Sequence, residues 1–390
     1  MTRFFARKSA SILCLSAAGL LTIGLVMLFS ASAYARDSHG DTLFFIRKQG
    51  AWLVLGLIAA TFAALVDYRI WRRLWLPLWL LALVLLALCF VPGIGMKLNG
   101  SWRWVRLGPI SFQPSEIAKF AAVLFTAHWF ARIEGRQREF LRGIVVPVVV
   151  VGSMMALIIL EADLGTTALM GCNLIGMMFI AGSNLLWVSP LGLGALGGLV
   201  YIITRMPERM GRLMAFLYPE QHRDGAGFQQ FQGLVAFGSG GLEGVGLGSG
   251  RQKMFYLPYA HTDFILPMVG EELGLRATLA IAFGFLLFVA AGCSIAMHAR
   301  DRFGSLLAVG LTMCIAIQAA INIAVTTCLL PNKGMPLPFI SAGGSNLCLC
   351  LFAIGLLISI HRASPIYRGE REPRESGGAM PLPATEPREG

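Results

Sequence analysis

The stretch GSLLAVGLTMCIAIQAAINIAVTTC, residues 304–328, decides the class of fold. It contains no Asp, Glu, Lys, Arg or His, and it is longer than the roughly 20 residues that an α-helix needs to cross a bilayer. Similar apolar runs recur along the 390-residue chain, which is 56% hydrophobic and 14% charged. A soluble domain averages about 25% charged residues. The sequence therefore predicts an all-α polytopic membrane protein.

Ten such runs are predicted to span the membrane. They cover residues 11–34, 50–67, 75–93, 115–132, 143–161, 164–184, 187–205, 270–297, 304–328 and 340–361. Residues 206–262 are predicted to form a long extracytoplasmic loop between the seventh and eighth helices. Residues 1–362 then make one ten-helix transmembrane domain. The Pro-, Gly-, Arg- and Glu-rich remainder, residues 363–390, is predicted to be a disordered cytoplasmic tail.

Basic residues in the short loops indicate the orientation. Arg and Lys gather in DYRIWRR (67–73), ARIEGRQREFLRG (131–143) and HARDR (298–302), and the positive-inside rule places these loops in the cytoplasm. Both termini are then cytoplasmic. The first span ends in SASAYA (30–35), which is similar to a secretory signal. Its apolar core is longer than that of a usual signal, so we expect an uncleaved helix.

Several other functional classes are not indicated. The net charge of +11 does not indicate a nucleic-acid-binding protein, because the basic residues lie between apolar runs rather than on one face. GVGLGSGRQK (244–253) fits neither GxGxxG nor a Walker A motif. The eight Cys fall in apolar runs without CxxC spacing and are interpreted as small buried hydrophobic residues.

Four unusual segments join spans on the face opposite the basic loops. They are LNGSWRWVRLGPISFQPSE (98–116), EADLGT (161–166), the long loop ending in LPYAHTDF (257–264), and LLPNKGMPLPFISAGGS (329–345). A chain that gathers its unusual positions on one face is predicted to have one site there. Within the long loop, RMPERMGRLMAFLYPE (205–220) predicts a basic amphipathic helix, on the membrane surface or docked on the protein. The Gly-rich FGSGGLEGVGLGSG (237–250) predicts a mobile loop.

Asp263 is the first candidate catalytic residue, because it lies where the long loop re-enters the membrane. Partial burial raises the pKa of a carboxyl group and makes it a better base near neutral pH. The alternative is structural, since Thr262 or Asp263 precedes an apolar run and could cap the eighth helix. His261 is either a second proton carrier or a hydrogen-bonding loop residue.

Other acidic residues have similar paired interpretations. Glu116 and Lys119 share a helix face, either as a buried structural pair or as part of a functional site. Asp163 either caps the sixth span or belongs to the site. Glu271 and Glu272 lie near the start of the eighth span, where one of them complements the helix dipole.

Basic residues on the same face could bind a phosphate group or lipid headgroups. They are Arg103, Arg106, Lys253 and Lys333. An outward-facing site with carboxylates and cations suits a transferase that uses a lipid-linked phosphate sugar, or an ion-driven transporter. A transporter should show repetition of its spans and carboxylates at mid-span. The carboxylates here lie at span ends, which favours the transferase.

The unusual segments resemble those of the SEDS family (shape, elongation, division and sporulation), whose members include FtsW, RodA and SpoVE. The matching motifs are NGSWRWVRLGPISFQPSEIAKF (99–120), DLGTT (163–167), YLPYAHTDFILPMVGEELG (256–274) and GMPLPFISAGGSN (334–346). The resemblance implies a ten-helix peptidoglycan glycosyltransferase that polymerises lipid II in the bacterial cytoplasmic membrane. It also implies partners, namely a class B penicillin-binding protein and other membrane proteins of the divisome or elongasome.

The resemblance also carries functional residues to this sequence. The essential carboxylate of the family falls on Asp263. Supporting positions in or near the motifs are Glu116, Lys119, Asp163, Arg103, Arg106, His261, Glu271, Lys333 and Ser341. The implied reaction inverts the donor sugar, and Asp263 takes the proton from the acceptor GlcNAc 4-hydroxyl. Positive charge for the departing pyrophosphate would come from Lys119, Arg103, Arg106 or a divalent cation, Mg²⁺ or Mn²⁺.

The sequence departs from the family pattern at three points. The common QPDLG is EADLG here, which introduces Glu161; ISYGGSS is ISAGGSN; and LPEAHTDF has Tyr259 in place of Glu. GSGRQKMFYLP (248–258) resembles the FtsW-like division branch more than the RodA-like elongation branch. Two further functions stay open, a lipid II flippase and a non-catalytic scaffold that activates the penicillin-binding protein.

Overall fold

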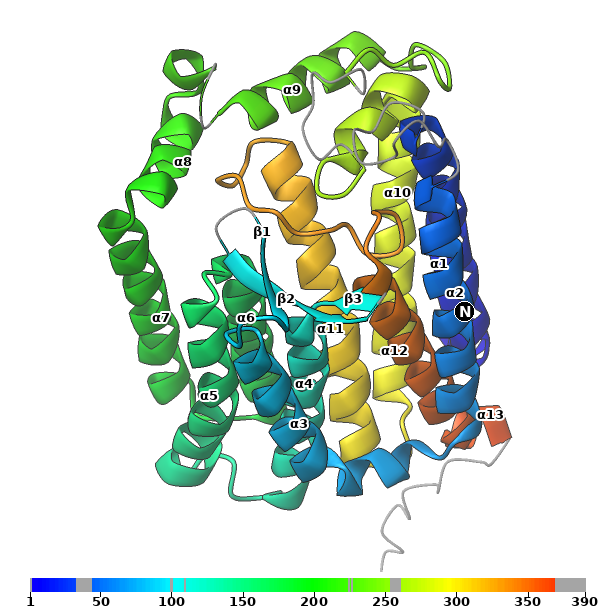
Figure 1. Ribbon diagram of the computed structural model, residues 1–390. Coiled ribbons are helices and arrows are strands. Elements are labelled where there is room, and N and C mark those ends of the chain that lie inside the picture. The colour runs from blue at the N-terminus through cyan, green and yellow to red at the C-terminus, as the bar shows by residue number, and fades with distance from the viewer. Residues whose placement is uncertain are drawn as a thin grey trace, which may run out of the picture.

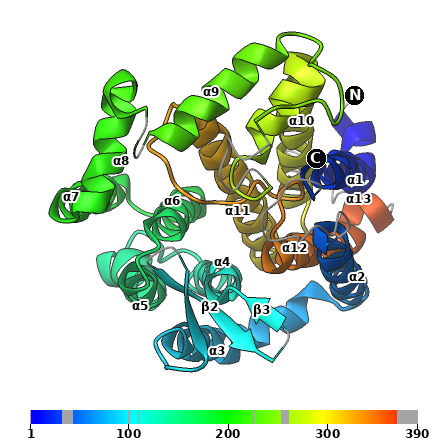
Figure 2. The same cartoon turned by 45° about the horizontal axis from the view of Figure 1, so that its top comes forward.

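The computed structural model describes residues 2–32, 44–98, 101–108, 110–223, 225, 227–252 and 261–368. Within those ranges, the helices of 14 residues or more form a bundle (Figures 1 and 2). They are α1 (Thr2–Ser32), α2 (Phe44–Leu65), α3 (Trp75–Leu88), α4 (Pro114–Arg132), α5 (Val146–Leu160), α6 (Leu164–Ala181), α7 (Leu185–Arg205), α10 (Ile265–Met297), α11 (Arg302–Thr326) and α12 (Gly344–Ala363). Each overlaps one predicted span. Shorter helical turns are η2 (Tyr68–Arg73), η3 (Leu141–Val145) and α13 (Pro365–Arg368).

Eight of the described helices are long and apolar enough to cross a membrane. Of the other two, α3 has 14 residues and α4 carries Glu116 and Lys119 among its apolar residues. Exposed apolar side chains on α2, such as Ile58 at 63% and Phe62 at 56% exposure, suit lipid rather than water. The chain is therefore a multi-pass membrane protein, as the sequence predicts. The number of ten spans and the side on which the termini lie stay predictions.

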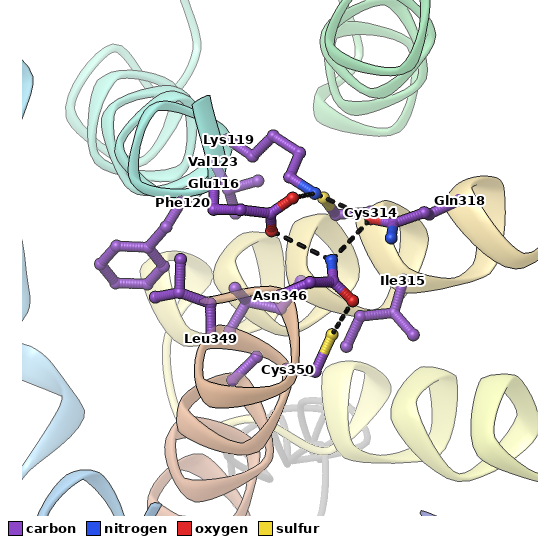
Figure 3. A pocket seen from close by; sticks show the side chains of 12 residues that line it. Glu116, Lys119, Phe120, Val123, Cys314, Ile315, Gln318, Asn346, Leu349 and Cys350 are labelled. Atoms are coloured by element: carbon purple, nitrogen blue, oxygen red, sulfur yellow. Dashed lines mark hydrogen bonds and ion pairs between the residues drawn. The ribbon is translucent and has the colours of Figure 1, made fainter. Parts of the chain in front are cut away.

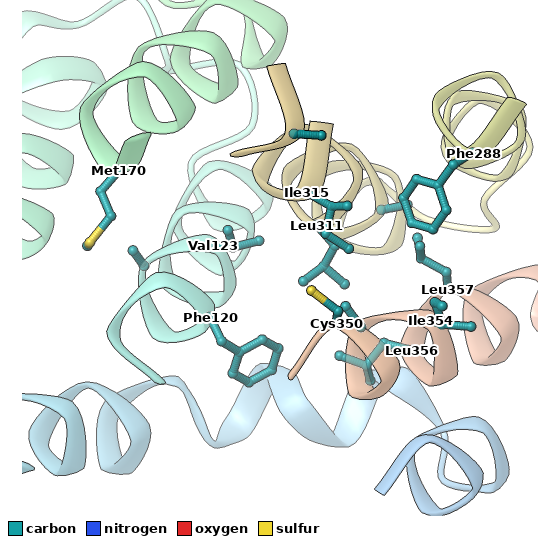
Figure 4. Close-up of a cluster of buried hydrophobic side chains, with 14 of the residues drawn as sticks. Phe120, Val123, Met170, Phe288, Leu311, Ile315, Cys350, Ile354, Leu356 and Leu357 are labelled. Carbon is teal, nitrogen blue, oxygen red and sulfur yellow. The ribbon is translucent and has the colours of Figure 1, made fainter. Parts of the chain in front are cut away.

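The centre of the bundle is formed by α4, α11 and α12. Phe120 of α4, Leu311 of α11 and Ile354 of α12 belong to one cluster of buried apolar side chains (Figure 4). Around it, α2 packs along α12 and α1 packs along α10. In contrast, α7 stands at the edge of the bundle, and only 6% of its apolar stretch is buried (Figure 2). Polar residues on the central helices are thus cut off from both water and lipid.

A small antiparallel sheet, which apolar periodicity does not predict, joins α3 to α4. Its strands are β1 (Gly95–Leu98), β2 (Ser101–Leu107) and β3 (Ile110–Phe112), in the order β1-β2-β3. A β-bulge interrupts β2 at Arg103, because Met96 pairs with Trp104 and Lys97 pairs with Trp102. Arg103 is partly buried, with its Nη1 4.0 Å from Asp163 Oδ2, while Arg106 is exposed. The sheet therefore turns Arg103 toward the bundle and Arg106 away from it.

The segment between α7 and α10 contains further helices. They are α8 (Pro207–Leu217), η4 (Pro219–His222) and α9 (Phe228–Gly240). The presence of α8 confirms the predicted amphipathic helix, and its position on a membrane surface stays a prediction. Phe237–Gly240, the first part of the Gly-rich stretch, belongs to α9 rather than to a loop.

The rest of the Gly-rich stretch is held by the start of α10. The Glu271 carboxylate accepts hydrogen bonds from the backbone N–H groups of Arg251 (2.8 Å) and Gln252 (3.2 Å). The Glu272 carboxylate accepts from the Gly248 N–H (2.9 Å) and from the Ser30 hydroxyl of α1 (2.8 Å). These bonds fasten the loop that the sequence predicts to be mobile. The two glutamates thus act as loop anchors, a role that dipole compensation does not describe.

The connection between α11 and α12 is buried although it is neither helix nor strand. Leu337 and Phe339 are 1% and 2% exposed. The Gln49 side chain donates to the Ser341 carbonyl (3.3 Å), and the Ser341 hydroxyl accepts from the Leu337 N–H (2.8 Å). Irregular backbone in a membrane protein is tolerated where protein surrounds it or where it lines a cavity. This buried connection can therefore line a site inside the bundle.

Some predictions fall outside the described residues. These are the part of SASAYA after Ser32, Lys253, Tyr259, and residues 369–390 of the predicted tail. The first residues of that tail are helical, because α12 continues to Ala363 and α13 follows it. The predicted boundary at residue 362 therefore lies within helical structure.

Candidate active site

A cavity of ≈ 330 Å³ lies between the sheet, the beginning of α2 and the buried connection before α12. Asp263 and His261 line it, together with Arg103 of β2 and Gly334 of the buried connection. Residues from three of the four unusual segments thus meet at one place. This agrees with the prediction of a single site at one end of the bundle.

Asp263 directs its carboxylate to this site rather than to a helix terminus. The N-cap of α10 is Phe264, and no side chain caps that helix. The capping interpretation of Asp263 is therefore wrong. Within the described part of the chain its carboxylate accepts no hydrogen bond, and a Cβ atom placed on Gly334 would lie 2.5 Å from its Oδ2. The absence of a side chain at 334 leaves the space that the carboxylate needs.

The surroundings of Asp263 shift its pKa. Burial raises the pKa of Asp263 to about 6, while the positive charge of Arg103 lowers it and the negative charge of Asp163 raises it. A carboxyl group with this pKa is mostly ionised at pH 7 and is a stronger base than an ordinary aspartate. The position therefore has the acid–base property that the sequence argument requires.

Asp163 combines the two interpretations that the sequence leaves open. Its Oδ1 accepts the Thr166 N–H (3.1 Å) and so caps α6. Its Oδ2 accepts from the Thr166 hydroxyl (2.9 Å) and from Gln113 Nε2 (3.2 Å), and lies 4.0 Å from Arg103 Nη1. Asp163 thus connects the remaining unusual segment, EADLGT (161–166), to the cavity through Arg103. The Arg103 Nε atom is buried and has no hydrogen-bond partner within the described residues.

The comparison with protein families now decides the class of protein. A family model described as "Cell cycle protein" (FtsW/RodA/SpoVE) matches residues 11–365. The chain belongs to the FtsW/RodA/SpoVE family. This confirms the resemblance that the four motifs indicate.

Relatives and solved structures agree with the family membership. The chain is 40% identical over 351 residues to the probable peptidoglycan glycosyltransferase FtsW of Trichlorobacter lovleyi, covering 90% of this chain and 92% of the relative. It is 42% identical over 346 residues to stage V sporulation protein E of Bacillus subtilis, covering 88% and 94%. The crystal structure of rod shape determining protein RodA from Thermus thermophilus is similar, with a TM-score of 0.67, 26% identity, and coverage of 90% and 96%.

A further similar chain comes from a structure that shows "Structural coordination of polymerization and crosslinking by a peptidoglycan synthase complex". Its TM-score is 0.73 at 26% identity, covering 90% of this chain and 96% of that one. Both structures cover 90% of this chain, so the fold of the chain resembles that of these two proteins over most of its length.

Glu116 and Lys119 lie beside the cavity, in a separate pocket of ≈ 40 Å³ (Figure 3). Lys119 Nζ is 2.8 Å from Glu116 Oε1 and 2.7 Å from the side-chain oxygen of Gln318 on α11. Asn346 of α12 donates to Glu116 Oε2 (3.0 Å) and lines both the pocket and the cavity. In this family member the ion pair is thus buried and hydrogen-bonded to Gln318 and Asn346. Asn346 connects it to the cavity.

The remaining predicted site residues are distributed around the cavity. The His261 ring lines it and lies against Phe45, with ring centroids 4.3 Å apart. Glu271 anchors the Gly-rich loop, and Ser341 is hydrogen-bonded inside the buried connection. Arg106 is exposed on the far face of β2. Lys333 adjoins Gly334, and burial together with nearby Arg209 and Arg212 lowers the pKa of Lys333.

Other residues of this family member line the cavity but are not singled out by the motifs. They are Lys48, Gln49 and Trp52 of α2, Gln113 before α4, and Asn346. Trp52 packs on Gly344, where a Cβ atom would collide with its ring. A Lys and a Gln at the first turn of a membrane helix is a signal that sequence analysis could have used. Lys48 adds a second cation to the cavity beside Arg103.

Binding of a divalent cation, Mg²⁺ or Mn²⁺, at this cavity stays a prediction. No group of three or more His, Cys, Asp or Glu side chains that could hold a metal ion occurs within the described ranges. The negative charge of Asp163 acts on both Asp263 and Glu161. A cation bound there would need further ligands from substrate or water.

Proposed function

We propose that this chain is a peptidoglycan glycosyltransferase that polymerises lipid II, with Asp263 as its general base. The observation that carries the proposal is the Asp263 carboxylate, which lines the cavity, caps no helix and has its pKa raised to about 6. The FtsW relatives at 40% identity, which are named probable peptidoglycan glycosyltransferases, support the reaction class.

The proposed step forms one C–O bond and breaks another. The 4-hydroxyl oxygen of the acceptor GlcNAc attacks the anomeric carbon of the donor sugar, whose α-linkage to pyrophosphate breaks. Asp263 accepts the hydroxyl proton, and the new linkage is β, so one inversion occurs. General-base catalysis of this kind contributes about 10²–10⁴-fold to the rate. The undecaprenyl pyrophosphate leaves with the bonding electron pair.

The negative charge that develops on the leaving group requires cations. Arg103 and Lys48 both line the cavity, and Arg103 Nε has no hydrogen-bond partner within the described residues. A guanidinium with a free N–H can bind a phosphate oxygen. We assign this role to Arg103, supported by Lys48 or by a divalent cation. Lys119 is committed to Glu116 and Gln318, and Arg106 points away from the cavity.

The setting of the reaction follows from the same proposal. The cavity end of the bundle faces the outside of the bacterial cytoplasmic membrane, and both termini are cytoplasmic. The partner is a class B penicillin-binding protein that cross-links the glycan product, together with other membrane proteins of division or elongation. The division branch is favoured by the FtsW relatives at 40% identity.

The test is polymerisation of fluorescent lipid II by the purified chain with its co-expressed partner. Wild type should yield glycan ladders on a gel, and Asp263→Ala should reduce the rate by at least about 100-fold. Asp67→Ala is a matched control, because the Asp67 side chain caps η2 through the Arg69 N–H (2.9 Å) outside the cavity. That variant should stay active. Size-exclusion profiles must show that all three proteins are folded.

Two outcomes would replace the proposal. An inactive wild-type chain that moves lipid II across proteoliposomes would be a flippase. A chain that neither polymerises nor moves lipid II, but increases cross-linking by its partner, would be a scaffold. Equal activity of wild type and folded Asp263→Ala would keep the polymerase and exclude Asp263 as its base.

A further inference from the structure

Two buried amide side chains lie one turn apart on α11, in the centre of the bundle. Gln318 and Asn322 are each 2% exposed, and α11 is otherwise largely apolar. A buried amide in a membrane helix is costly unless it is hydrogen-bonded, and it then usually has a specific task. Neither residue belongs to the motifs that carry the proposed reaction.

Asn322 holds two separate pieces of backbone together. Its Nδ2 donates to the carbonyl of Asp263 (2.9 Å) and to the carbonyl of Met335 (2.6 Å). An amide –NH₂ has two N–H donors, so one serves each carbonyl. The segment that bears the candidate base is thus joined to the buried connection, whose Gly334 lies against the Asp263 carboxylate.

Gln318 extends the same arrangement to the ion pair. Its Nε2 donates to the carbonyl of Pro336 (2.9 Å), which directly follows Met335. Its Oε1 accepts from Lys119 (2.7 Å) and from Asn346 (3.3 Å), both of which also contact Glu116 (Figure 3). Two consecutive carbonyls of the buried connection are therefore fixed by two side chains of one rigid helix.

We propose that Asn322 is a positioning residue for Asp263, and that Gln318 links this support to the Glu116–Lys119 pair. The inference rests on the proposed function, since it assigns a task within that reaction. Asn322 touches only the backbone of Asp263, so it acts through the base and does not contact substrate. The buried ion pair accordingly serves to hold the wall of the cavity opposite the carboxylate.

Loss of this support should affect rate more than binding. A displacement of about 1 Å at a reacting group can cost about 100-fold in rate. Without the Asn322 bonds, the Asp263 segment is free to move toward the cavity, where its carboxylate is better hydrated. Arg103 and Asp163 act on that carboxylate by charge, while His261 and Lys48 line the same cavity. Better hydration lowers the pKa of Asp263 from about 6 toward its ordinary value.

The experiment compares Asn322→Leu with Asn173→Leu in the lipid II assay with the co-expressed partner. Asn173 is a matched control, because it is a 4% exposed asparagine of α6 that donates to the Gly310 carbonyl (3.4 Å) away from the cavity. Asn322→Leu should lower kcat by about 100-fold with KM nearly unchanged. The acidic limb of its pH–rate profile should move to lower pH. Asn173→Leu should leave both kcat and the pH profile near wild type.

A second variant keeps the inference testable if Asn322→Leu does not fold. Asn322→Ser retains one donor for two carbonyls and should give an intermediate loss of kcat with the same direction of pH shift. A folded Asn322→Ser or Asn322→Leu with wild-type kcat and an unmoved pH profile would overturn the inference. An equal loss in Asn173→Leu would also overturn it, because the effect would then be general destabilisation. If wild type itself does not polymerise, the proposed function fails, which is a separate result.

Discussion

The two ends of the bundle differ in how their carboxylates are hydrogen-bonded. At one end, Asp301 caps α11: it accepts from the Gly304 N–H (2.8 Å), the Tyr68 hydroxyl (2.5 Å) and Arg69 Nε (3.0 Å). At the cavity end, the buried Glu161 carboxylate oxygens have no hydrogen-bond partner among N–H and O–H groups of the described residues, and the Asp263 carboxylate accepts no hydrogen bond from them. A fully paired carboxylate stabilises the fold, and an unpaired one costs stability and keeps its reactivity.

The difference reverses the direction of the pKa shifts. Burial raises the pKa of Glu161 to about 8, with the Cys89 thiol lowering it and the charge of Asp163 raising it further. The pKa of Asp301 is lowered despite its burial, because hydrogen bonds from Tyr68 and Gly304 favour its charged form. The contribution of Glu161 to the free energy of unfolding therefore falls as pH rises, whereas the contribution of Asp301 grows.

The largest expected effect concerns the buried ion pair near the cavity. Lys119→Met leaves Glu116 buried without its cation and should lower the free energy of unfolding by about 3–5 kcal/mol. Arg69→Met is the comparison at the other end, where the Arg69 side chain is 44% exposed. It should cost less than about 1 kcal/mol. Thermal and denaturant unfolding in detergent measures both.

The double variant Glu116→Leu/Lys119→Met sharpens this test. Replacing both partners by apolar side chains of similar size often restores stability. We expect recovery of most of the lost stability but not of lipid II polymerisation, because Gln318 loses its Lys119 donor. A double variant as unstable as Lys119→Met would mean that the pair itself stabilises the fold, rather than that an unpaired Glu116 destabilises it.

A smaller effect is expected from Glu161, and its sign depends on pH. The pKa of Glu161 is about 8 in the folded chain, against an ordinary value of 4.5. Between these values the folded state holds a proton that the unfolded state has lost, so the free energy of unfolding falls as pH rises from about 4.5 to 8. Glu161→Gln should therefore raise Tm more at pH 8.5 than at pH 5.

Asp301→Asn provides the opposite case. The lowered pKa of Asp301 stabilises the fold above its ordinary value of 3.8, and this contribution is lost as pH falls. The variant should lower Tm at pH 7, and the difference from wild type should shrink on acidification. Parallel pH dependence of the two variants would break the contrast between the two ends.

The smallest effect is expected from an exposed ion pair. Arg276 Nη1 lies 3.1 Å from Glu243 Oε1, but the two side chains are 73% and 75% exposed. Exposed pairs contribute roughly 0–1 kcal/mol, so Arg276→Ala should change the unfolding free energy by less than about 1 kcal/mol, and salt should reduce the effect. A larger loss would mean that solvent exposure does not determine how much an ion pair contributes to the free energy of unfolding.

Much of the helical framework could be predicted from the sequence. Runs such as 304–328 are long and free of charge, so their position and type follow directly from the need to bury apolar surface. The motif around Asp263 lines the cavity, and its role as the site stays a prediction. Its capping interpretation failed because α10 begins at Ile265, which makes Phe264 the N-cap in place of Thr262 or Asp263.

The parts that could not be predicted depend on contacts between distant segments. The sheet over residues 95–112 has no long apolar alternation, and its strands of 3 to 7 residues are defined by pairing with one another. Glu271 anchors a loop about 20 residues earlier in the chain. Gln318 and Asn322 lie inside a long apolar run, where their partners could not be inferred from spacing.

Gly334 adds a constraint of another kind. Its backbone has no positive φ that would favour glycine, so the local conformation accepts any residue. Only the Asp263 carboxylate, whose Oδ2 would lie 2.5 Å from a Cβ there, forbids a side chain. Substitutions of Gly334 are thus expected to impair the site without destabilising the fold. A library of variants at position 334 should therefore keep many residues when it is selected for folding and few when it is selected for growth. That difference would separate the requirement of the fold from the requirement of the site.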